Sequence, residues 1–198
     1  MNQADYYVDY MERMLDKGVA AFILQFYDEV NKKRGKQWEI SRVVSFVNVG
    51  DKAYSVMKVG SLPVDLKARI LGATGGGVYG RAYRISASDV TLGTPDKWQN
   101  FNSAILTQPE TEIYPGSEVT FNTPVEELAV EANWLHAPIN AITNIQNQAK
   151  GYPARAFGGN HILNPVDYVL FEIESYDSTQ DASATLEMYE GKLDFYPD

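Results

Sequence analysis

The sequence of 198 residues contains no cysteine and only two histidines, His136 and His161. Without cysteine the chain can form no disulfide, no thiolate-ligated zinc site, no iron–sulfur cluster and no thiol nucleophile. The two histidines are far apart, neither is next to an acidic residue, and the H-E-x-x-H and G-x-S-x-G motifs are absent. These absences argue against a zinc hydrolase and a serine-histidine triad. We therefore expect a protein that is not an enzyme and that uses no cofactor or metal.

Long apolar runs and an excess of positive charge are also missing. The longest apolar run, Val19–Leu24, is too short to cross a bilayer, and the first fifteen residues lack the basic and apolar regions of a secretory signal. Acidic residues outnumber basic ones by 26 to 17, which gives a net charge of −9. Nucleic acids and anionic membranes both attract positive surfaces, so we expect neither as a partner.

The first part of the chain has the periodicity of a helix. Apolar residues recur at spacings of three and four over residues 2–34. Acidic residues come early, Lys32, Lys33 and Arg34 come late, and Gly35 follows, which suits the helix dipole and a glycine stop. We predict an amphipathic helical arm over residues 1–36. Its apolar face, which packs against its own sheet or against a neighbouring subunit, comprises Tyr7, Met11, Leu15, Phe22, Phe26 and Val30.

From Trp38 onward the apolar residues alternate with a period of two, and glycine and proline punctuate the segments. This pattern predicts a mainly β domain over residues 37–198, an antiparallel β-sandwich of the jelly-roll or immunoglobulin-like type. Gly50 and Asp51 fit a turn. Gly75, Gly77 and Gly80 match G-x-G-x-x-G, but a strand pattern follows instead of a helix, so we predict a hairpin connection.

The segment Val166–Ser175 is the clearest strand. Val169, Phe171 and Ile173 share one face. The other face is apolar at the start of the segment and becomes polar at Glu172 and Glu174, so we expect the strand inside a sheet. Its expected partner is the segment Ala184–Tyr196, in which Gly191 marks either a bulge or a turn between two short strands. The two glutamates are also the best pair for a glycan-cleaving site, although such pairs in an acidic protein are usually a solvated face.

A long loop is predicted over Tyr152–Pro165, and long loops in compact domains often carry function. Aromatic residues of sandwich loops stack on sugar rings or plug the ends of the core. A carbohydrate-binding or receptor-binding lectin-like module is therefore the alternative hypothesis. Its ligand site would contain Trp134, Tyr152, Arg155, Phe157 and His161.

In composition and layout, with an amphipathic arm before an aromatic β-sandwich, the chain is similar to virion structural proteins of tailed bacteriophages. The resemblance implies a capsid decoration, head-fibre or tail protein that is assembled in the host cytoplasm and resides in the virion. It also implies protein–protein contacts with other copies of itself or with other structural proteins, and a glycan as a possible ligand.

Overall fold

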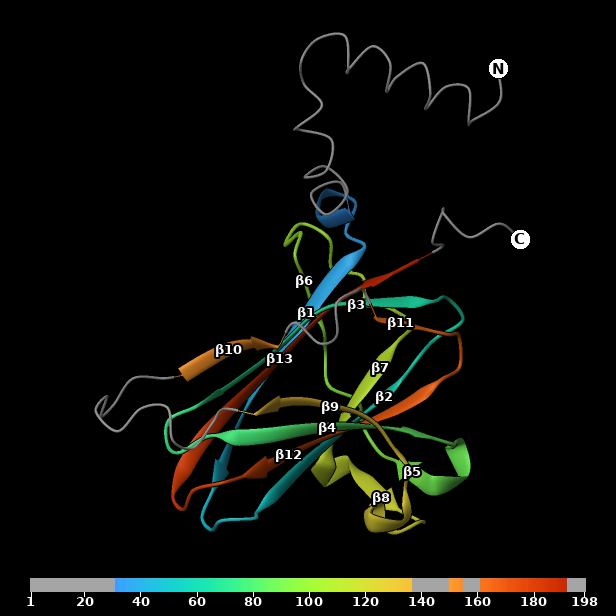
Figure 1. Ribbon diagram of the computed structural model, residues 1–198. Coiled ribbons are helices and arrows are strands. Elements are labelled where there is room, and N and C mark those ends of the chain that lie inside the picture. The colour runs from blue at the N-terminus through green and yellow to red at the C-terminus, as the bar shows by residue number, and fades with distance from the viewer. Residues whose placement is uncertain (1–30, 137–149, 155–160, 192–198) are drawn as a thin grey trace, which may run out of the picture.

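Antiparallel β-strands make up most of the structure (Figure 1). The computed structural model describes residues 31–136, 150–154 and 161–191, of which 67–70, 130–136, 150–154 and 161 are described by their backbone alone. The strands are β1 (Gln37–Phe46), β2 (Lys52–Lys58), β3 (Val64–Ala73), β4 (Val78–Ile85), β5 (Val90–Leu92), β6 (Gln99–Asn100), β7 (Glu112–Pro115), β8 (Val119–Phe121), β9 (Val130–His136), β10 (Lys150–Ala154), β11 (His161–Leu163), β12 (Tyr168–Ser175) and β13 (Gln180–Glu190). Three short 3-10 turns lie among them, η1 (Ala87–Asp89), η2 (Gly116–Glu118) and η3 (Val125–Glu127).

Two sheets carry most of the strands. Sheet A has the order β10-β3-β13-β1-β6, with β11 also paired to β3, and sheet B has the order β7-β2-β12-β4-β9. All of these pairs are antiparallel. Strands β5 and β8 form a separate two-stranded sheet. The predicted mainly β, antiparallel class is confirmed, and the two large sheets have a sandwich-like arrangement.

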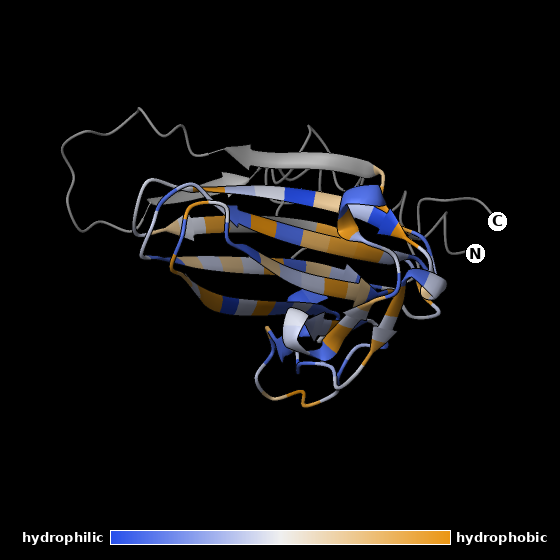
Figure 2. Ribbon diagram, turned by 90° about the horizontal axis from the view of Figure 1, so that it is seen from below, coloured by the Kyte–Doolittle hydropathy of each residue, from blue (hydrophilic) through white to orange (hydrophobic). Residues whose placement is uncertain are grey.

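The hydrophobic core lies between sheets A and B. Side chains alternate between the two faces of a strand. Figure 2 shows bands of alternating hydropathy along the strands, as this arrangement requires. Both sheets contribute buried residues to one cluster. From sheet A come Trp38, Phe46, Val64, Leu66, Leu71, Ala73, Leu163, Ala182, Leu186 and Met188, and from sheet B come Met57, Val78, Ala82, Ile113, Val169 and Phe171. Burial of this apolar surface is the main contribution to stability.

The outer face of sheet B is covered as well. A second cluster joins its residues Val56, Tyr83 and Leu170 to Val90 of β5 and Val125 of η3. Leu92, Val119 and Phe121 pack on it from the small β5-β8 sheet. This second layer explains why β12 is apolar on both faces over its first half, as the sequence indicated.

Two predictions about connections are wrong. Strand β12 lies inside a sheet as expected, but its partners are β2 and β4, whereas β13 lies in sheet A. The glycine segment after β3 is not a hairpin, because it leads from β3 in sheet A to β4 in sheet B. The connections β1–β2 and β12–β13 also pass between the sheets. Alternation identifies the faces of a strand, but a turn between sheets and a hairpin turn can have the same composition.

Other segments also differ from the expectation. Residues 101–107, where the punctuation by proline on the C-terminal side favours a strand, form a loop instead. The predicted long loop at 152–165 contains part of β10 and all of β11, both paired to β3. Strand β13 ends at Glu190, and its register irregularity lies between Glu187 and Met188, before Gly191. Ile139, Ile142 and Ile145 have helical spacing in the sequence and favour a short helix over a loop at 138–149, but this segment lies outside the described residues.

Candidate functional site

The residues of the predicted ligand loop do not lie on one element. Trp134 is in β9 at the edge of sheet B, whereas Tyr152 and His161 are in β10 and β11, which pair with β3 in sheet A. Arg155 and Phe157 lie outside the described residues. The three described positions therefore belong to three strands in two sheets, and the ligand site stays a prediction.

The predicted assembly face, from Tyr7 to Val30, lies outside the described residues. The base of the arm is described, and residues 31–33 are helical. The helix ends at Gly35, whose φ of 66° is in the left-handed region, so the predicted glycine stop is confirmed. A Cβ on Gly35 would lie 2.6 Å from Ile105 Cδ1, so a larger residue would clash there.

Residues 31–36 are fastened to the β-domain by the loop that follows β6, and we call residues 31–36 and 100–106 together the collar (Figure 1). Asn100 Nδ2 donates to the Gly35 carbonyl oxygen at 2.9 Å, and Asn102 Nδ2 donates to the Lys33 carbonyl oxygen at 2.8 Å. The Lys32 ammonium lies 4.8 Å from the centre of the Phe101 ring. These contacts bond the last carbonyl groups of the helix and hold its end on the domain.

The surface of the collar is basic and partly apolar. Lys33, Arg34 and Lys36 are exposed, and residues 31–36 contain no acidic side chain. On the loop, the Leu106 side chain is 88% exposed, the largest exposed fraction among the large hydrophobic residues that the structure describes. Charge and an exposed aliphatic side chain therefore occur together where the arm joins the domain.

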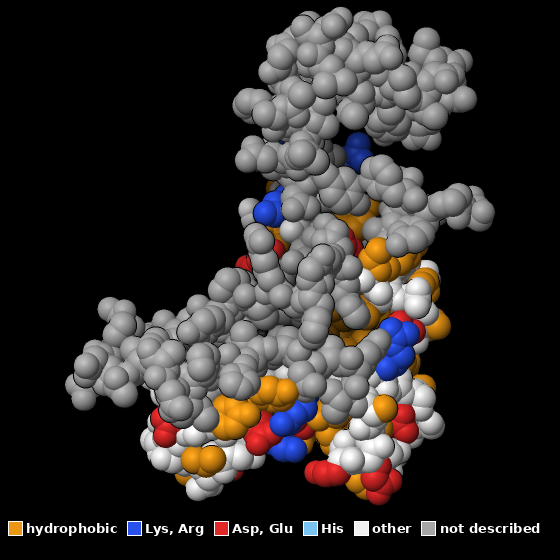
Figure 3. Space-filling view, in the orientation of Figure 1, with side chains coloured by type: hydrophobic (Ala, Val, Ile, Leu, Met, Phe, Trp, Pro, Cys, Tyr) orange, Lys and Arg blue, Asp and Glu red, His pale blue; other side chains and the backbone are white. Residues whose placement is uncertain are grey.

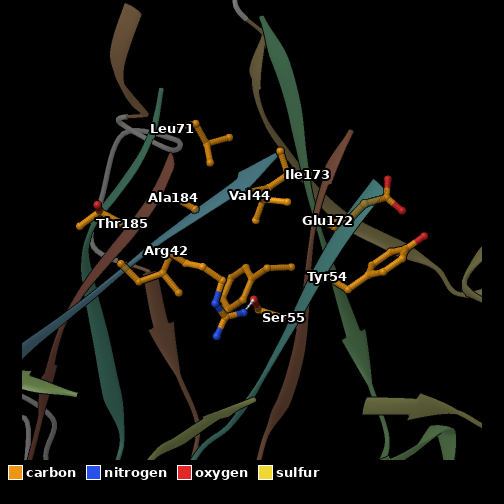
Figure 4. Close-up of a pocket in the computed structure, with 12 residues that line it drawn as sticks. Arg42, Val44, Tyr54, Ser55, Leu71, Glu172, Ile173, Ala184 and Thr185 are labelled. Carbon is orange, nitrogen blue, oxygen red and sulfur yellow. Dashed lines mark hydrogen bonds between the residues drawn. The ribbon is translucent and has the colours of Figure 1, made fainter. Parts of the chain in front are cut away.

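A small pocket lies between the two sheets (Figure 4). Its volume is about 50 Å³, and its walls are mostly apolar. Val44, Leu71, Ala184 and Leu186 line it from sheet A, and Ala53, Phe171 and Ile173 line it from sheet B. In Figure 4 the Glu172 and Tyr54 side chains extend away from the pocket, so only the backbone side of these two residues borders it.

Arg42 is the one basic side chain that lines this pocket among the residues that the structure describes. Its Nη1 donates to Ser55 Oγ at 2.8 Å across the two sheets, and its Nη2 pairs with the Asp96 carboxylate. The guanidinium therefore joins both sheets to the segment that contains Asp96. These partners bond both terminal nitrogens of the Arg42 guanidinium. We therefore interpret the pocket as a packing defect beside this polar contact and not as a ligand site.

A second polar cluster lies on the outer face of sheet B, around Glu172 of β12. Glu172 is fully buried, contrary to the expectation of a solvated face. Its Oε1 accepts a hydrogen bond from Arg81 Nη1, which also donates to Glu174 Oε2 at 2.6 Å. Lys52 Nζ lies 3.5 Å from Glu172 Oε2. The two cations come from β4 and β2, the strands on either side of β12.

The cluster alters the ionisation of its neighbours. Burial, followed by the negative charge of Glu172, raises the pKa of Tyr54 to about 12, and the same two causes raise the pKa of Tyr83 to about 12. Burial lowers the pKa of the Arg81 guanidinium, but its hydrogen bonds to Glu174 and Glu172 outweigh that effect and raise the pKa above its ordinary value. Both tyrosines therefore stay neutral and Arg81 stays charged at neutral pH.

This geometry does not suit glycoside hydrolysis. The reaction needs two carboxyl groups that flank a scissile bond, one as acid and one as base or nucleophile. Glu172 and Glu174 instead lie side by side on one strand and bond to the same nitrogen of Arg81. Among the described residues, no group of three or more His, Asp or Glu side chains is placed to hold a metal ion.

Aromatic side chains border the exposed end of the cluster. The Arg81 guanidinium lies 4.4 Å from the centre of the Tyr79 ring, and Tyr176 packs edge-on against Tyr79 at 6.2 Å between ring centres. In the lower part of the side of the molecule seen in Figure 3, basic and acidic side chains lie next to hydrophobic ones. Sequence reasoning missed this group, although the alternation of Tyr79, Arg81 and Tyr83 along β4 indicated one shared face.

Comparisons with known proteins identified no family for the chain. No family model matches the sequence, and no curated protein matches it. In the part of the chain that the structure describes, no helix has both the length and the apolar character needed to cross a membrane.

Proposed function

We propose that the chain is a non-enzymatic structural protein, a bacteriophage-type virion component such as a capsid decoration, head-fibre or tail protein, and that its β-domain is a jelly roll. The observation that carries the proposal is the order of the strands in the two sheets. Jelly rolls are two-sheet folds of eight strands that occur in viral capsid and lectin domains. The fold alone assigns no activity. The choice between a capsid role and a lectin role must therefore rest on the arm and on the side-chain clusters.

The eight main strands in chain order are β1, β2, β3, β4, β9, β10, β12 and β13. Numbered one to eight, they give the order 6-3-8-1 in sheet A and 2-7-4-5 in sheet B. The steps from first to second, third to fourth, fifth to sixth and seventh to eighth strand all change sheet. This alternation is the pattern of a chain that was folded as a long hairpin and rolled up, which favours a jelly roll over an immunoglobulin-like sandwich.

The base of the arm favours assembly over a free binding module. An amphipathic stretch of 30 residues precedes a collar that is bonded to the β-domain through Asn100 and Asn102. A wide apolar stripe must be buried against something, and an arm fixed at its base presents that stripe at a defined place on the subunit. Neighbouring copies, or other structural proteins of the assembly, are the partners this layout suits.

The mass of the purified protein in solution, by light scattering after gel filtration, tests the proposal. We expect a defined oligomer, and we expect Phe22→Ser with Phe26→Ser to reduce it to a monomer whose β-domain keeps its thermal unfolding transition. Val166→Ser, at an exposed apolar position of the β-domain, is the control and should leave the mass unchanged. An unchanged oligomer in the double variant would exclude the arm as the assembly element.

The alternative function, a carbohydrate-binding or receptor-binding lectin-like module, is favoured by the group formed by Tyr79, Tyr176, Arg81 and Glu174. Aromatic rings beside charged hydrogen-bonding groups suit the apolar faces and hydroxyls of sugars. Binding of an oligosaccharide in a glycan array, abolished by Tyr79→Ala and kept in Tyr114→Phe, would support this alternative. A monomer that binds no glycan would contradict self-assembly and the lectin-like alternative, and would leave assembly with other structural proteins.

A further inference from the structure

We propose that the collar of one subunit binds the acidic arm of a second copy of the chain. The inference rests on the proposed assembly function and names the contact that would carry it. The collar is the described surface where exposed positive charge and an exposed leucine meet, and the chain itself contains a segment with the complementary charge and an apolar stripe.

The charges of the two segments are opposite and equal in size. Residues 1–30 contain six acidic and two basic side chains, a net charge of −4, whereas residues 31–36 contain four basic side chains and no acidic one. The acidic residues nearest the start are Asp5, Asp9, Glu12 and Asp16. Opposite charges on two surfaces steer association and fix its register, and like charges oppose the wrong pairing.

The collar is built to receive a partner without rearranging. The hydrogen bonds from Asn100 and Asn102 and the packing of Ile105 on Gly35 hold its two segments together. Arg34, Lys36 and Leu106 remain exposed on it. A fixed surface loses little conformational entropy on binding, so more of the contact energy appears as affinity. Leu106 would enter the apolar stripe of the incoming arm, and the basic side chains would meet its carboxylates.

Two charge-reversed chains test the contact. One carries Asp5→Lys, Asp9→Lys and Glu12→Lys in the arm, and the other carries Arg34→Glu and Lys36→Glu in the collar. We expect each chain alone to assemble at least about tenfold more weakly than the unchanged protein. An equimolar mixture should recover assembly, because the acidic arm of the second chain then meets the basic collar of the first. Arg84→Glu, on β4, is the control for a reversed charge elsewhere.

The outcomes separate this inference from the proposed function. If the wild-type protein assembles and the collar variant assembles equally well, the collar contact is wrong. Assembly would then use another surface. Weak assembly of both reversed chains without recovery in the mixture would also overturn the collar contact. A monomeric unchanged protein would contradict self-assembly itself. If the contact is correct, Leu106→Ser weakens assembly, Val166→Ser does not, and raising the salt from 0.05 to 0.5 M, on the order of a threefold fall in Debye length, weakens it further.

Discussion

The Glu172 carboxylate is fully buried on the outer face of sheet B, where Arg81 of the neighbouring strand donates a hydrogen bond to it. The two residues are directly opposite in the register of β12 and β4. Removing a charge from water costs several kcal/mol, and a nearby opposite charge with good geometry offsets that cost. The burial of Glu172 thus depends on Arg81.

Replacement of Arg81 should therefore lower the free energy of unfolding. Arg81→Met keeps much of the aliphatic stem but leaves Lys52, at 3.5 Å, as the remaining cation beside Glu172 among the described residues. Breaking a buried ion pair costs about 3 kcal/mol of stability or more, and we expect the lower end because Lys52 remains. Urea unfolding at pH 7 measures the loss.

Two further variants control that measurement. Lys58→Ala breaks the pair with Glu112, in which both side chains are more than a third exposed, and should cost about 1 kcal/mol or less. The double variant Arg81→Met with Glu172→Met removes both charges and should be more stable than Arg81→Met alone. A single Arg81 variant as stable as the unchanged protein would show that the carboxylate has another source of compensation.

The burial of Glu172 illustrates what the sequence could not reveal. Alternation correctly placed Val169 and Phe171 on the core side of β12, because side-chain direction depends only on the strand itself. The fate of the other face depends on Arg81, 91 residues earlier, and on the covering β5-β8 sheet. No local pattern contains that information, so a buried, ion-paired glutamate and a solvated glutamate look the same in the sequence.

The helix stop at Gly35 and the predicted ligand loop show the same contrast between local and long-range information. Gly35 could be recognised as the helix stop because a left-handed residue at a helix end favours glycine. The sheet to which Trp134 belongs, and the other sheet to which Tyr152 and His161 belong, could not be recognised, because they follow from strand pairing across distant parts of the chain. The glycine stop and the core face of β12, which depend on local conformation, were confirmed, whereas the pairing of β12 with the last strand was wrong.

The corner between β1 and β2 should make stability depend on pH. Asp51 accepts the backbone N–H groups of Asn48 and Val47, which lowers its pKa below the ordinary value of 3.8. A carboxyl with a lowered pKa in the folded state stabilises the protein fully above its unfolded pKa, and the contribution is lost as the pH falls through the folded pKa. The stability difference between the unchanged protein and Asp51→Asn should thus be constant from pH 7 to about 5 and shrink below about pH 4.

Urea unfolding at several pH values checks this expectation. Glu127→Gln removes the same charge from an exposed carboxyl in η3 and is the control. A difference between Asp51→Asn and the unchanged protein that grew as the pH fell would contradict the lowered pKa of Asp51.

Filling the pocket between the sheets should stabilise the domain. Ala184 lines the pocket of about 50 Å³, and Figure 4 shows it beside Val44 and Leu71. Ala184→Val adds two carbon atoms that a strand accommodates well, and cavity filling contributes about 1 kcal/mol in favourable cases. Ser183→Val, at the exposed position next to it, is the matched control for the strand preference of valine. Equal gains in both variants, measured by thermal unfolding, would show that the pocket has no part in the effect.

Glu190 should fix the segment that precedes β7 onto the end of β13. Its carboxylate is buried and accepts the N–H of Glu110 at 2.9 Å, the N–H of Thr111 at 2.7 Å and the Thr111 hydroxyl at 2.6 Å. Thr111 in turn accepts the indole N–H of the buried Trp98 through its carbonyl oxygen at 2.9 Å. One side chain therefore bonds three donors and, through Thr111, orients a core tryptophan.

Replacement of Glu190 by alanine should leave those donors without a partner, at a cost of roughly 3 kcal/mol or more, because each buried unsatisfied donor costs about 1–3 kcal/mol. Glu190→Gln keeps one acceptor oxygen and should lose less. Hydrogen exchange gives the sharper readout, since the amides of Glu110 and Thr111 should lose protection in Glu190→Ala before the amides of β12 do. If the amides of Glu110, Thr111 and β12 lost protection together, this segment would unfold only with the whole sandwich. Glu190 would then stabilise the whole domain and not the segment before β7 alone.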